Sequence, residues 1–323
     1  MSDAQPSRAT LSQLVADHLG ADPGQVHLRP CPTGKHNQTY FVDAADQSLV
    51  LRIAPPDDPA QMLFYEYRMM RQEPGLHAVL RQRTDARVPE ILAFDASHQR
   101  LDRDYLLMER MPGTPLSDFA GLTGHMFNSV LRQVGQCLRQ AHSITGHGYG
   151  YVGAHRPMEP QSDWPSAFAI MWNKLLDDIR RGGGYSADEA DFMRRLLDRH
   201  ARVFEHPASA SLLHMDVWAQ NILADDEGRL TALLDWDRTL WGDPEIEFAV
   251  LDYCGISEPA FWEGYGAERD RSPEAEVRRM FYLLYELQKY IFIRRVRRNR
   301  PVEAEWFRQQ SLRLARSLAS EGG

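Results

Sequence analysis

Residues 1–111 carry the short apolar runs and alternating apolar positions that are typical of β-strands. The strand-like stretches cover residues 26–28, 39–44, 48–54, 89–95 and 104–111. Two helices are expected among them: residues 11–19, with Thr10 as the N-cap, and residues 60–73, which would end at Pro74–Gly75. The pattern therefore predicts a small β-rich lobe with one main internal helix.

After Pro112 the apolar spacing changes to the 3.6-residue period of amphipathic helices, beginning with the long pattern from Phe127 to Ala141. Further helical patterns cover residues 166–180, 187–203, 278–298 and 303–318. Between residues 212 and 237, short apolar runs alternate with polar turns. The sequence thus predicts an α+β chain with two parts, an N-terminal lobe over residues 1–111 and a larger, mainly helical lobe over residues 112–323.

Composition places the chain among ordinary globular proteins, with 43% hydrophobic and 25% charged residues in 323. The net charge of −8 argues against a general binder of nucleic-acid backbones. Three scattered cysteines, apolar runs of at most six residues and an N-terminus without an apolar signal segment indicate a cytoplasmic protein. No membrane or nucleic-acid partner is expected, and the oligomeric state stays open.

Lysine is rare in this chain. Of 37 basic residues only Lys35, Lys174 and Lys289 are lysines. Chemistry that needs a lysine therefore has few candidates.

The stretch from Leu212 to Val250 carries the residues that best indicate chemistry. It contains His214-x-Asp216, then Asn221, then Asp235-Trp-Asp237, then Asp243 in a Gly-Asp-Pro turn. A carboxylate and a carboxamide on one short loop can meet a hydroxyl group and a hard cation at a single site. Asp235 follows an apolar strand and could supply a second oxygen ligand to the same cation. Mg²⁺ favours such oxygen ligands, and phosphoryl transfer needs little more than an aligned hydroxyl and neutralised phosphates.

This ordered set resembles the core of the aminoglycoside phosphotransferase and choline kinase superfamily, which is related to protein kinases. The resemblance extends over roughly residues 32–265 and implies a bilobal, protein-kinase-like fold. It implies that Asp216 orients and helps to deprotonate the acceptor hydroxyl, and that His214 braces its loop. It further implies the other roles in this segment: Mg²⁺ ligands at Asn221 and Asp235, and support of the loop backbone by Asp243. Asp237 would either support the metal site or cap a turn.

Upstream, the stretch from Pro32 to Tyr40 resembles the nucleotide-binding loop of the same superfamily. The residues that would approach the phosphates of ATP, or of GTP, are Gly34, Lys35, His36 and Asn37. Taken alone, this stretch would be a hairpin turn. Arg52 stands where kinases hold a lysine against the phosphates, and Glu66 on the next helix would be its partner. The alternative for Glu66 is a solvated position on a helix face.

Residues 106–113 resemble the hinge between the lobes of these kinases. The backbone around Glu109 and Met111 would meet the adenine edge, with Met108 beside it, and the alternative is an ordinary edge strand.

Two departures from protein kinases favour a small-molecule acceptor. Met215 replaces the arginine that reads activation-loop phosphorylation, and few residues separate Asp235 from Asp243. Candidate acceptor-binding residues are Trp218, Gln220, Asp252, Glu258 and Trp262, together with Trp164, Tyr253 and Glu263. The alternative is core packing for the aromatic residues and a solvated rim for the acids. The arginines between 294 and 300 are interpreted as a solvated helix face.

The resemblance implies an ATP- and Mg²⁺-dependent kinase, acting most plausibly on an aminoglycoside-like, sugar-bearing or nucleoside antibiotic. A metabolite kinase acting on choline, homoserine or an amino sugar is the alternative within the enzyme class. A nucleotide-binding pseudokinase or scaffold is the alternative of another class, against which the intact Asp216, Asn221 and Asp235 set argues. Residues 205–270 hold 15 acids and 3 arginines, an acidity that would suit Mg²⁺ and a cationic substrate.

Overall fold

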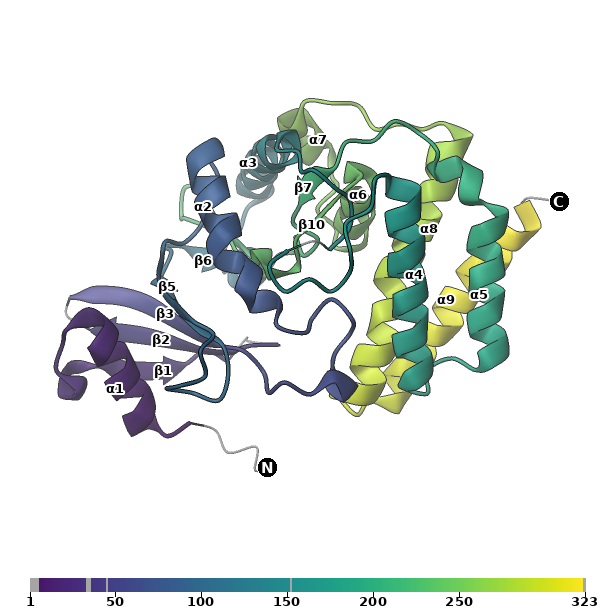
Figure 1. Cartoon of the computed structure of the whole chain (residues 1–323). Helices are drawn as coiled ribbons and strands as arrows, with labels where there is room; N and C mark the ends of the chain where they lie inside the picture. Colours follow the sequence, from purple (N-terminus) through teal and green to yellow (C-terminus); the bar gives the residue numbers. More distant parts are fainter. Residues whose placement is uncertain (1–5, 33–35, 45, 152, 322–323) are drawn as a thin grey trace.

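Five antiparallel strands form the sheet of the N-terminal lobe, in the spatial order β1-β2-β3-β5-β4 (Figure 1). They are β1 (His27–Pro30), β2 (Gln38–Ala44), β3 (Gln47–Ile53), β4 (Ile91–Asp95) and β5 (Tyr105–Glu109). The computed structural model describes residues 6–32, 36–44, 46–151 and 153–321. Helix α1 (Arg8–Leu19) packs its leucines on the sheet and is capped by Ser7, not by Thr10 as expected, because the Ser7 hydroxyl accepts from the Thr10 amide. The predicted strands of this lobe are thus confirmed.

The helix expected over residues 60–73 is wrong. Residues 54–72 contain only short 3₁₀ turns, and helix α2 (Glu73–Arg83) begins where the sequence analysis ended the expected helix. Pro74 lies in the first turn of α2, a position where a missing N–H costs no hydrogen bond. Pro74, which the sequence analysis placed at the end of a helix, therefore lies at the beginning of one.

Residues 54–72, which we name the interlobe strap, run from β3 across to the C-terminal lobe and back to α2 (Figure 1). Arg181 of helix α4 (Trp164–Arg181) donates to the carbonyls of Pro59 (3.1 Å) and Met62 (3.1 Å). The carboxylate of Asp178, on the same helix, accepts from the Phe64 amide at 2.6 Å. The strap thus connects the two lobes through hydrogen bonds between residues 59–64 and helix α4.

The C-terminal lobe is mainly helical, as predicted. Its other helices are α3 (Gly124–Ser143), α5 (Ala187–Arg199), α6 (Pro244–Tyr253), α7 (Pro259–Tyr265), α8 (Pro273–Phe292) and α9 (Pro301–Glu321). Helices α3 and α7 pack in close contact because Gly135 and Gly264 face the partner backbone; a Cβ at either would clash with a carbonyl oxygen. Helices α4, α5, α8 and α9 surround a second core with buried aromatic residues such as Trp172 and Phe281 (Figure 1).

Two small sheets carry the loops of the candidate site. One has the order β6-β8-β9, from β6 (Thr114–Pro115), β8 (Ile222–Ala224) and β9 (Leu230–Leu233). The other pairs β7 (Ser211–Leu213) with β10 (Leu240–Gly242). These strands hold the segment after β7 next to the segment after β9.

Helix α8 ends in a π-helical turn, η7 (Ile293–Arg297), before α9. Its arginines, with Arg300 at the start of α9, form ion pairs within the chain: Arg294 and Arg300 with Glu303, and Arg297 with Glu66. Among the described residues, no helix has both the length and the apolar content that a membrane span requires.

Candidate active site

The loop after β7 positions Asp216 through hydrogen bonds that fix its neighbours. His214 Nδ1 accepts from the Asp216 amide (3.2 Å), so its Nε2 carries the proton and donates to the Leu234 carbonyl (2.8 Å). Asn221 Nδ2 donates to the Asp216 carbonyl (2.9 Å) and to Asp216 Oδ2 (3.0 Å). The Leu234 amide donates to the Asn221 carbonyl at 2.9 Å. The structure therefore brings Asp216, Asn221 and the residue that precedes Asp235 into one bonded unit.

A buried carboxylate that the sequence analysis missed, Glu247 of α6, supports this loop from below. It accepts from the amides of His214 (3.1 Å) and Met215 (2.5 Å) and from His142 Nε2 (2.7 Å). Burial alone would raise the pKa of Glu247, but the hydrogen bond and charge of His142 lower it below its ordinary value. Met215 has a φ of 66°, a strained value for this residue type, and its bond to Glu247 helps to hold it there.

The role predicted for Asp243, support of the catalytic-loop backbone, is wrong, since Glu247 does that work. Asp243 caps helix α6, where its Oδ1 accepts from the Glu245 amide at 3.0 Å. Its Oδ2 accepts from the Tyr282 hydroxyl (2.8 Å) and from His206 (2.9 Å). A carboxylate directly before a proline at a helix start is a common cap, which explains the difference.

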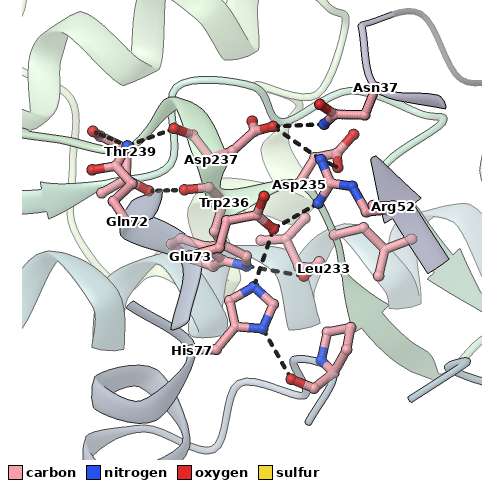
Figure 2. Close-up of polar contacts among 12 residues, drawn as sticks. Asn37, Arg52, Gln72, Glu73, His77, Leu233, Asp235, Trp236, Asp237 and Thr239 are labelled. Atoms are coloured by element: carbon pink, nitrogen blue, oxygen red, sulfur yellow. Dashed lines mark hydrogen bonds and ion pairs between the residues drawn. The ribbon is translucent and has the colours of Figure 1, made fainter. Parts of the chain in front are cut away.

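Opposite this loop, Arg52 lies among three carboxylates (Figure 2). Its Nη1 donates to Glu73 (2.6 Å), and its Nη2 pairs with Asp235 (3.0 Å) and donates to Asp237 (2.9 Å). Arg52 is only 5% exposed. Burial would lower its pKa, but the three carboxylates raise it above the ordinary value, so the guanidinium stays charged. Asn37 adds a further bond to Asp237 at 3.3 Å.

The expected pair between Arg52 and Glu66 is wrong. Glu66 lies in the interlobe strap, where its carboxylate accepts from the Leu63 amide (2.8 Å) and forms an ion pair with Arg297. The partner of Arg52 is Glu73, because α2 begins at residue 73 and places its first turn beside β3. A contact of Glu66 with nucleotide stays a prediction.

The donor set around Asp235 fits a divalent cation. Three carboxyl groups share a single guanidinium, and burial raises the pKa of Glu73 to about 8, so the negative charge that exceeds the single positive charge comes mainly from Asp235 and Asp237. The Asp235 side chain is 42% exposed and is thus open to a ligand. The Asn221 amide nitrogen is engaged by Asp216, which leaves its carbonyl oxygen as the ligand atom. Asp235 and Asn221 could therefore hold Mg²⁺, whose preferred ligands are oxygen atoms.

The predicted nucleotide loop is described in part. Gly34 and Lys35 lie outside the described residues, whereas His36 and Asn37 come just before β2. Burial lowers the pKa of His36, against the charge of the nearby Glu66. At the predicted hinge, Met108 is buried, and the Glu109 amide donates to the Glu90 carbonyl at 2.8 Å. The adenine contact of Met108, Glu109 and Met111 stays a prediction.

The predicted acceptor residues do not form one group. Trp218 is half-buried in the catalytic loop, while the Gln220 amide oxygen accepts from the Ser117 hydroxyl (2.9 Å). Asp252 forms a double hydrogen bond with Arg269, with both distances 2.8 Å. Roles for these residues in acceptor binding stay predictions.

Two further candidates belong to helix α7 and its cap. Trp262 packs on Phe248 and Tyr265 between α6 and α7, and its indole N–H donates to Ser257 (3.0 Å). Glu258 is exposed at the start of α7. The core-packing interpretation therefore describes Trp262 better than a place in the acceptor pocket.

A charged cluster that the sequence analysis missed lies beside Asp216. Arg238 donates to the Met215 carbonyl (2.7 Å) and to Glu286 of α8 (3.0 Å). Lys289 pairs with the same carboxylate at 2.5 Å. Burial and the charge of Arg238 lower the pKa of Lys289, while Glu286 opposes that shift. Glu286 and Lys289 stand out in the sequence as charges within the long apolar stretch of α8, a signal that could have revealed them.

Comparisons with known proteins place this geometry in a family. The model of the phosphotransferase enzyme family matches residues 27–281. The "probable ketoamine kinase" of Staphylococcus aureus is 28% identical over 172 residues, which are 50% of this chain. The chain spans 58% of that relative's length.

Two solved structures share the fold. The "putative fructosamine-3-kinase" of Haemophilus somnus is 18% identical, with a TM-score of 0.67 over 95% of this chain and 96% of that one. A thermostable mutant of the aminoglycoside phosphotransferase APH(4)-Ia, in complex with AMP-PNP and hygromycin B, is 19% identical. Its TM-score is 0.65 over 95% of this chain and 98% of that one.

Proposed function

The chain belongs to the phosphotransferase enzyme family, and we propose that it transfers the γ-phosphate of ATP, with Mg²⁺, to a hydroxyl group of a small molecule. One observation carries this proposal: Asp216 and Asn221 are bonded to each other and to the residue before Asp235, across from a buried Arg52. The set combines a carboxylate for a hydroxyl proton, oxygen ligands for a cation and a guanidinium for phosphate.

The chain's own residues would share the work as follows. Asp216 would accept a hydrogen bond from the acceptor hydroxyl, orient its oxygen toward the phosphate and take up its proton. Asn221 and Asp235 would hold Mg²⁺, which neutralises negative charge on the phosphates when it is bound. Arg52 would bind phosphate oxygens with the planar guanidinium that its three carboxylates keep in place.

The acceptor is proposed to be a small molecule because the segment after Asp235 is short. Residues 236–243 form a 3₁₀ turn and strand β10, which pairs with β7 and leaves no long segment for docking a peptide. We propose a sugar hydroxyl as the target, as in an aminoglycoside-like, sugar-bearing or nucleoside antibiotic. Phosphorylation of such a compound would give resistance.

A second candidate is a metabolite kinase that phosphorylates an amine-linked sugar. The relative from Staphylococcus aureus and the structure from Haemophilus somnus both carry names of this kind, which favours this acceptor over choline or homoserine. The chemistry at Asp216 would be the same, and only the pocket that selects the sugar would differ.

The test is a screen of hydroxyl compounds with ATP and Mg²⁺, in which mass spectrometry detects and locates the added phosphate. The panel contains aminoglycosides, nucleoside antibiotics, ketoamines, choline and homoserine. Asp216→Asn should lower turnover by roughly 10³-fold, because it removes the group that receives the proton. Asp226→Asn, in the exposed turn between β8 and β9, is the matched control and should leave turnover unchanged.

Two results would count against the proposal. Turnover that survives in Asp216→Asn would remove the assigned role of Asp216. ATP binding without phosphorylation of any compound in the panel would instead favour the pseudokinase alternative. Growth of a sensitive host in the presence of an accepted antibiotic would test the resistance role separately.

A further inference from the structure

The backbone just before Asp216 is held by buried charged side chains from two other elements. Met215 has a φ of 66°, in the left-handed region that residues with a Cβ seldom adopt. Its N–H donates to Glu247 at 2.5 Å, and its carbonyl accepts from Arg238 Nη1 at 2.7 Å. A backbone conformation of this kind persists only where the surroundings fix it, so these two bonds help to determine the direction in which the chain enters Asp216.

The bond from Arg238 acts on the peptide group of Asp216 itself. The Met215 carbonyl and the Asp216 N–H belong to one planar group. The N–H donates to His214 Nδ1 at 3.2 Å and the carbonyl accepts from Arg238, so both ends of this plane are bonded. On the other side of the Asp216 Cα, Asn221 donates to the carbonyl and to the carboxylate. Arg238 and Asn221 thus fix the two sides of the same residue.

Arg238 is itself fixed by elements that are distant in the sequence. Its Nη2 donates to Glu286 of α8 at 3.0 Å, and its guanidinium carbon lies 5.3 Å from the centre of the Tyr65 ring in the interlobe strap. Burial would lower the pKa of Arg238, but Glu286 is the main cause that raises it above its ordinary value. Because a guanidinium is charged, planar and rigid, the bond of Nη2 to Glu286 also sets the direction of Nη1.

A second buried arginine, Arg278 of α8, shows what the same type of bonding does away from the catalytic loop. Arg278 donates to Glu245 through Nε (2.7 Å) and Nη2 (2.9 Å), and to the Val203 carbonyl through Nη1 (2.9 Å). Like Arg238, it joins a carboxylate to a backbone carbonyl. Only the carbonyl differs, because that of Val203 is far along the chain from Asp216. The two arginines therefore form a natural pair for separating stability from catalysis.

We propose that Arg238 is a positioning residue for phosphoryl transfer, which holds the Met215 carbonyl and thereby sets the orientation of Asp216 toward the acceptor hydroxyl. The proposal rests on the proposed function, because Arg238 acts through Asp216 in the same reaction. A small displacement of a reacting group slows the reaction between aligned groups strongly. Loss of the bond to Met215 should therefore lower kcat and leave the KM for ATP little changed.

The first test replaces Arg238 by lysine in the full chain. Lysine keeps the positive charge beside Glu286 but lacks the planar fork that serves a carboxylate and a carbonyl together. Arg238→Lys should lower kcat roughly 10- to 100-fold with an acceptor that the native chain phosphorylates. Arg278→Lys is the matched control, which makes the same exchange at a buried arginine. It should shift the midpoint of urea unfolding by a similar amount without changing kcat.

A double-mutant cycle separates positioning from a general loss of structure. If Arg238 acts through Asp216, Arg238→Lys should change turnover little in the Asp216→Asn background, where the carboxylate is already gone. Losses that multiply would overturn the proposal, as would a native kcat in Arg238→Lys. If Arg238→Lys does not fold, Glu286→Asp provides the same cycle, because it keeps the charges and draws the carboxylate away from Arg238 by one methylene.

Hydrogen exchange gives a readout that does not depend on turnover. The Met215 and Asp216 amides both donate within this bonded unit, so the peptide 212–221 should exchange faster in Arg238→Lys and at the native rate in Arg278→Lys. Native exchange in Arg238→Lys would overturn the proposal. Turnover that survives in Asp216→Asn would overturn the proposed function and this role of Arg238 with it. A loss in Asp216→Asn without a loss in Arg238→Lys would overturn this inference alone.

Discussion

Two buried clusters of charged side chains, one around Arg52 and one around Glu286, have opposite arrangements of charge. In the first cluster one cation, Arg52, contacts Glu73, Asp235 and Asp237. In the second cluster one carboxylate, Glu286, contacts Arg238 and Lys289. The first cluster keeps a surplus of negative charge, whereas the second is balanced once Asp216 is counted.

This difference indicates where a cation from solution can take part. The cluster around Arg52 has more carboxylates than cations and one exposed carboxylate, so it can bind a metal ion. The cluster around Glu286 is buried and its charges are balanced, so a metal ion would not stabilise it. Substitutions at the two centres should therefore respond differently to Mg²⁺.

Glu286→Gln should have the largest effect on stability. It leaves the buried charges of Arg238 and Lys289 without their shared carboxylate, and we expect a loss of about 3 kcal/mol in the free energy of unfolding. Urea unfolding measures this loss, and added Mg²⁺ should not restore it. A variant as stable as the native chain would show that Glu286 is not the centre of this cluster.

Arg52→Met should lower the free energy of unfolding by a smaller amount, about 2 kcal/mol. Asp235 is partly exposed, so water screens the repulsion among the carboxylates that lose their cation. Here millimolar Mg²⁺ should recover part of the loss, since it supplies the missing positive charge. Arg52→Lys is the matched control that keeps the charge but not the planar shape, and its KM for ATP should lie between those of native chain and Arg52→Met. Equal responses to Mg²⁺ at Arg52 and Glu286 would contradict the comparison.

His155, which joins the segment after α3 to the strap, offers an uncharged reference for the two clusters. Its Nε2 donates to the Tyr65 carbonyl at 3.1 Å, and burial lowers its pKa to about 4. The unfolded chain therefore binds this proton more readily, so stability should fall as the pH drops from about 6.5 toward 4. After allowance for partial exposure, the His155 share between pH 7 and 5 is on the order of 1 kcal/mol. Unfolding of His155→Gln should show a shallower pH dependence than the native chain.

Lys289→Met should have the smallest effect, less than about 1 kcal/mol. Arg238 still pairs with Glu286 in this variant, and an apolar side chain of similar length fills a site that is only 5% exposed. Thermal unfolding measures the change. A loss of stability as large as that of Glu286→Gln would mean that the ion pair of Glu286 with Lys289, rather than the one with Arg238, stabilises the cluster.

The sequence analysis predicted those parts of the candidate site whose residues lie close together along the chain. Asp216 and Asp235 each come shortly after a short strand and Asn221 directly precedes another, all within about twenty residues, so their order and spacing nearly determine that they meet. The strands of the N-terminal lobe and the long helices were likewise visible from their apolar spacing. Their boundaries shifted by a few residues, as at α4 and α8.

Contacts between distant elements could not be predicted in the same way. The partner of Arg52 depends on the path of the interlobe strap, whose apolar residues between Met62 and Met70 favoured a helix, and on Pro74, which lies in the first turn of α2. The sequence analysis gave the pairing to Glu66 because it placed a helix there, and the strap instead carries Glu66 to Arg297.

Glu247 and Glu286 were missed for a different reason. Each is a single carboxylate within an apolar helical stretch, and each is almost fully buried with partners from other elements. An isolated charge in an apolar helix is a signal that can be read from sequence, because burial without a partner would be too costly. Its partner can be identified only from the fold.

The arginine at position 52 also decides how the proposed nucleotide site would respond to covalent chemistry. A guanidinium with a raised pKa has no free electron pair, so reagents that acylate or sulfonylate a lysine amine next to the phosphates find no nucleophile there. Lys174 and Lys289 lie on α4 and α8 of the other lobe, which leaves Lys35, in the sequence stretch before β2, as the amine nearest along the chain to the nucleotide loop. If the proposed nucleotide site is right, an amine-directed nucleotide analogue would be expected to modify Lys35 and to leave Arg52 unmodified.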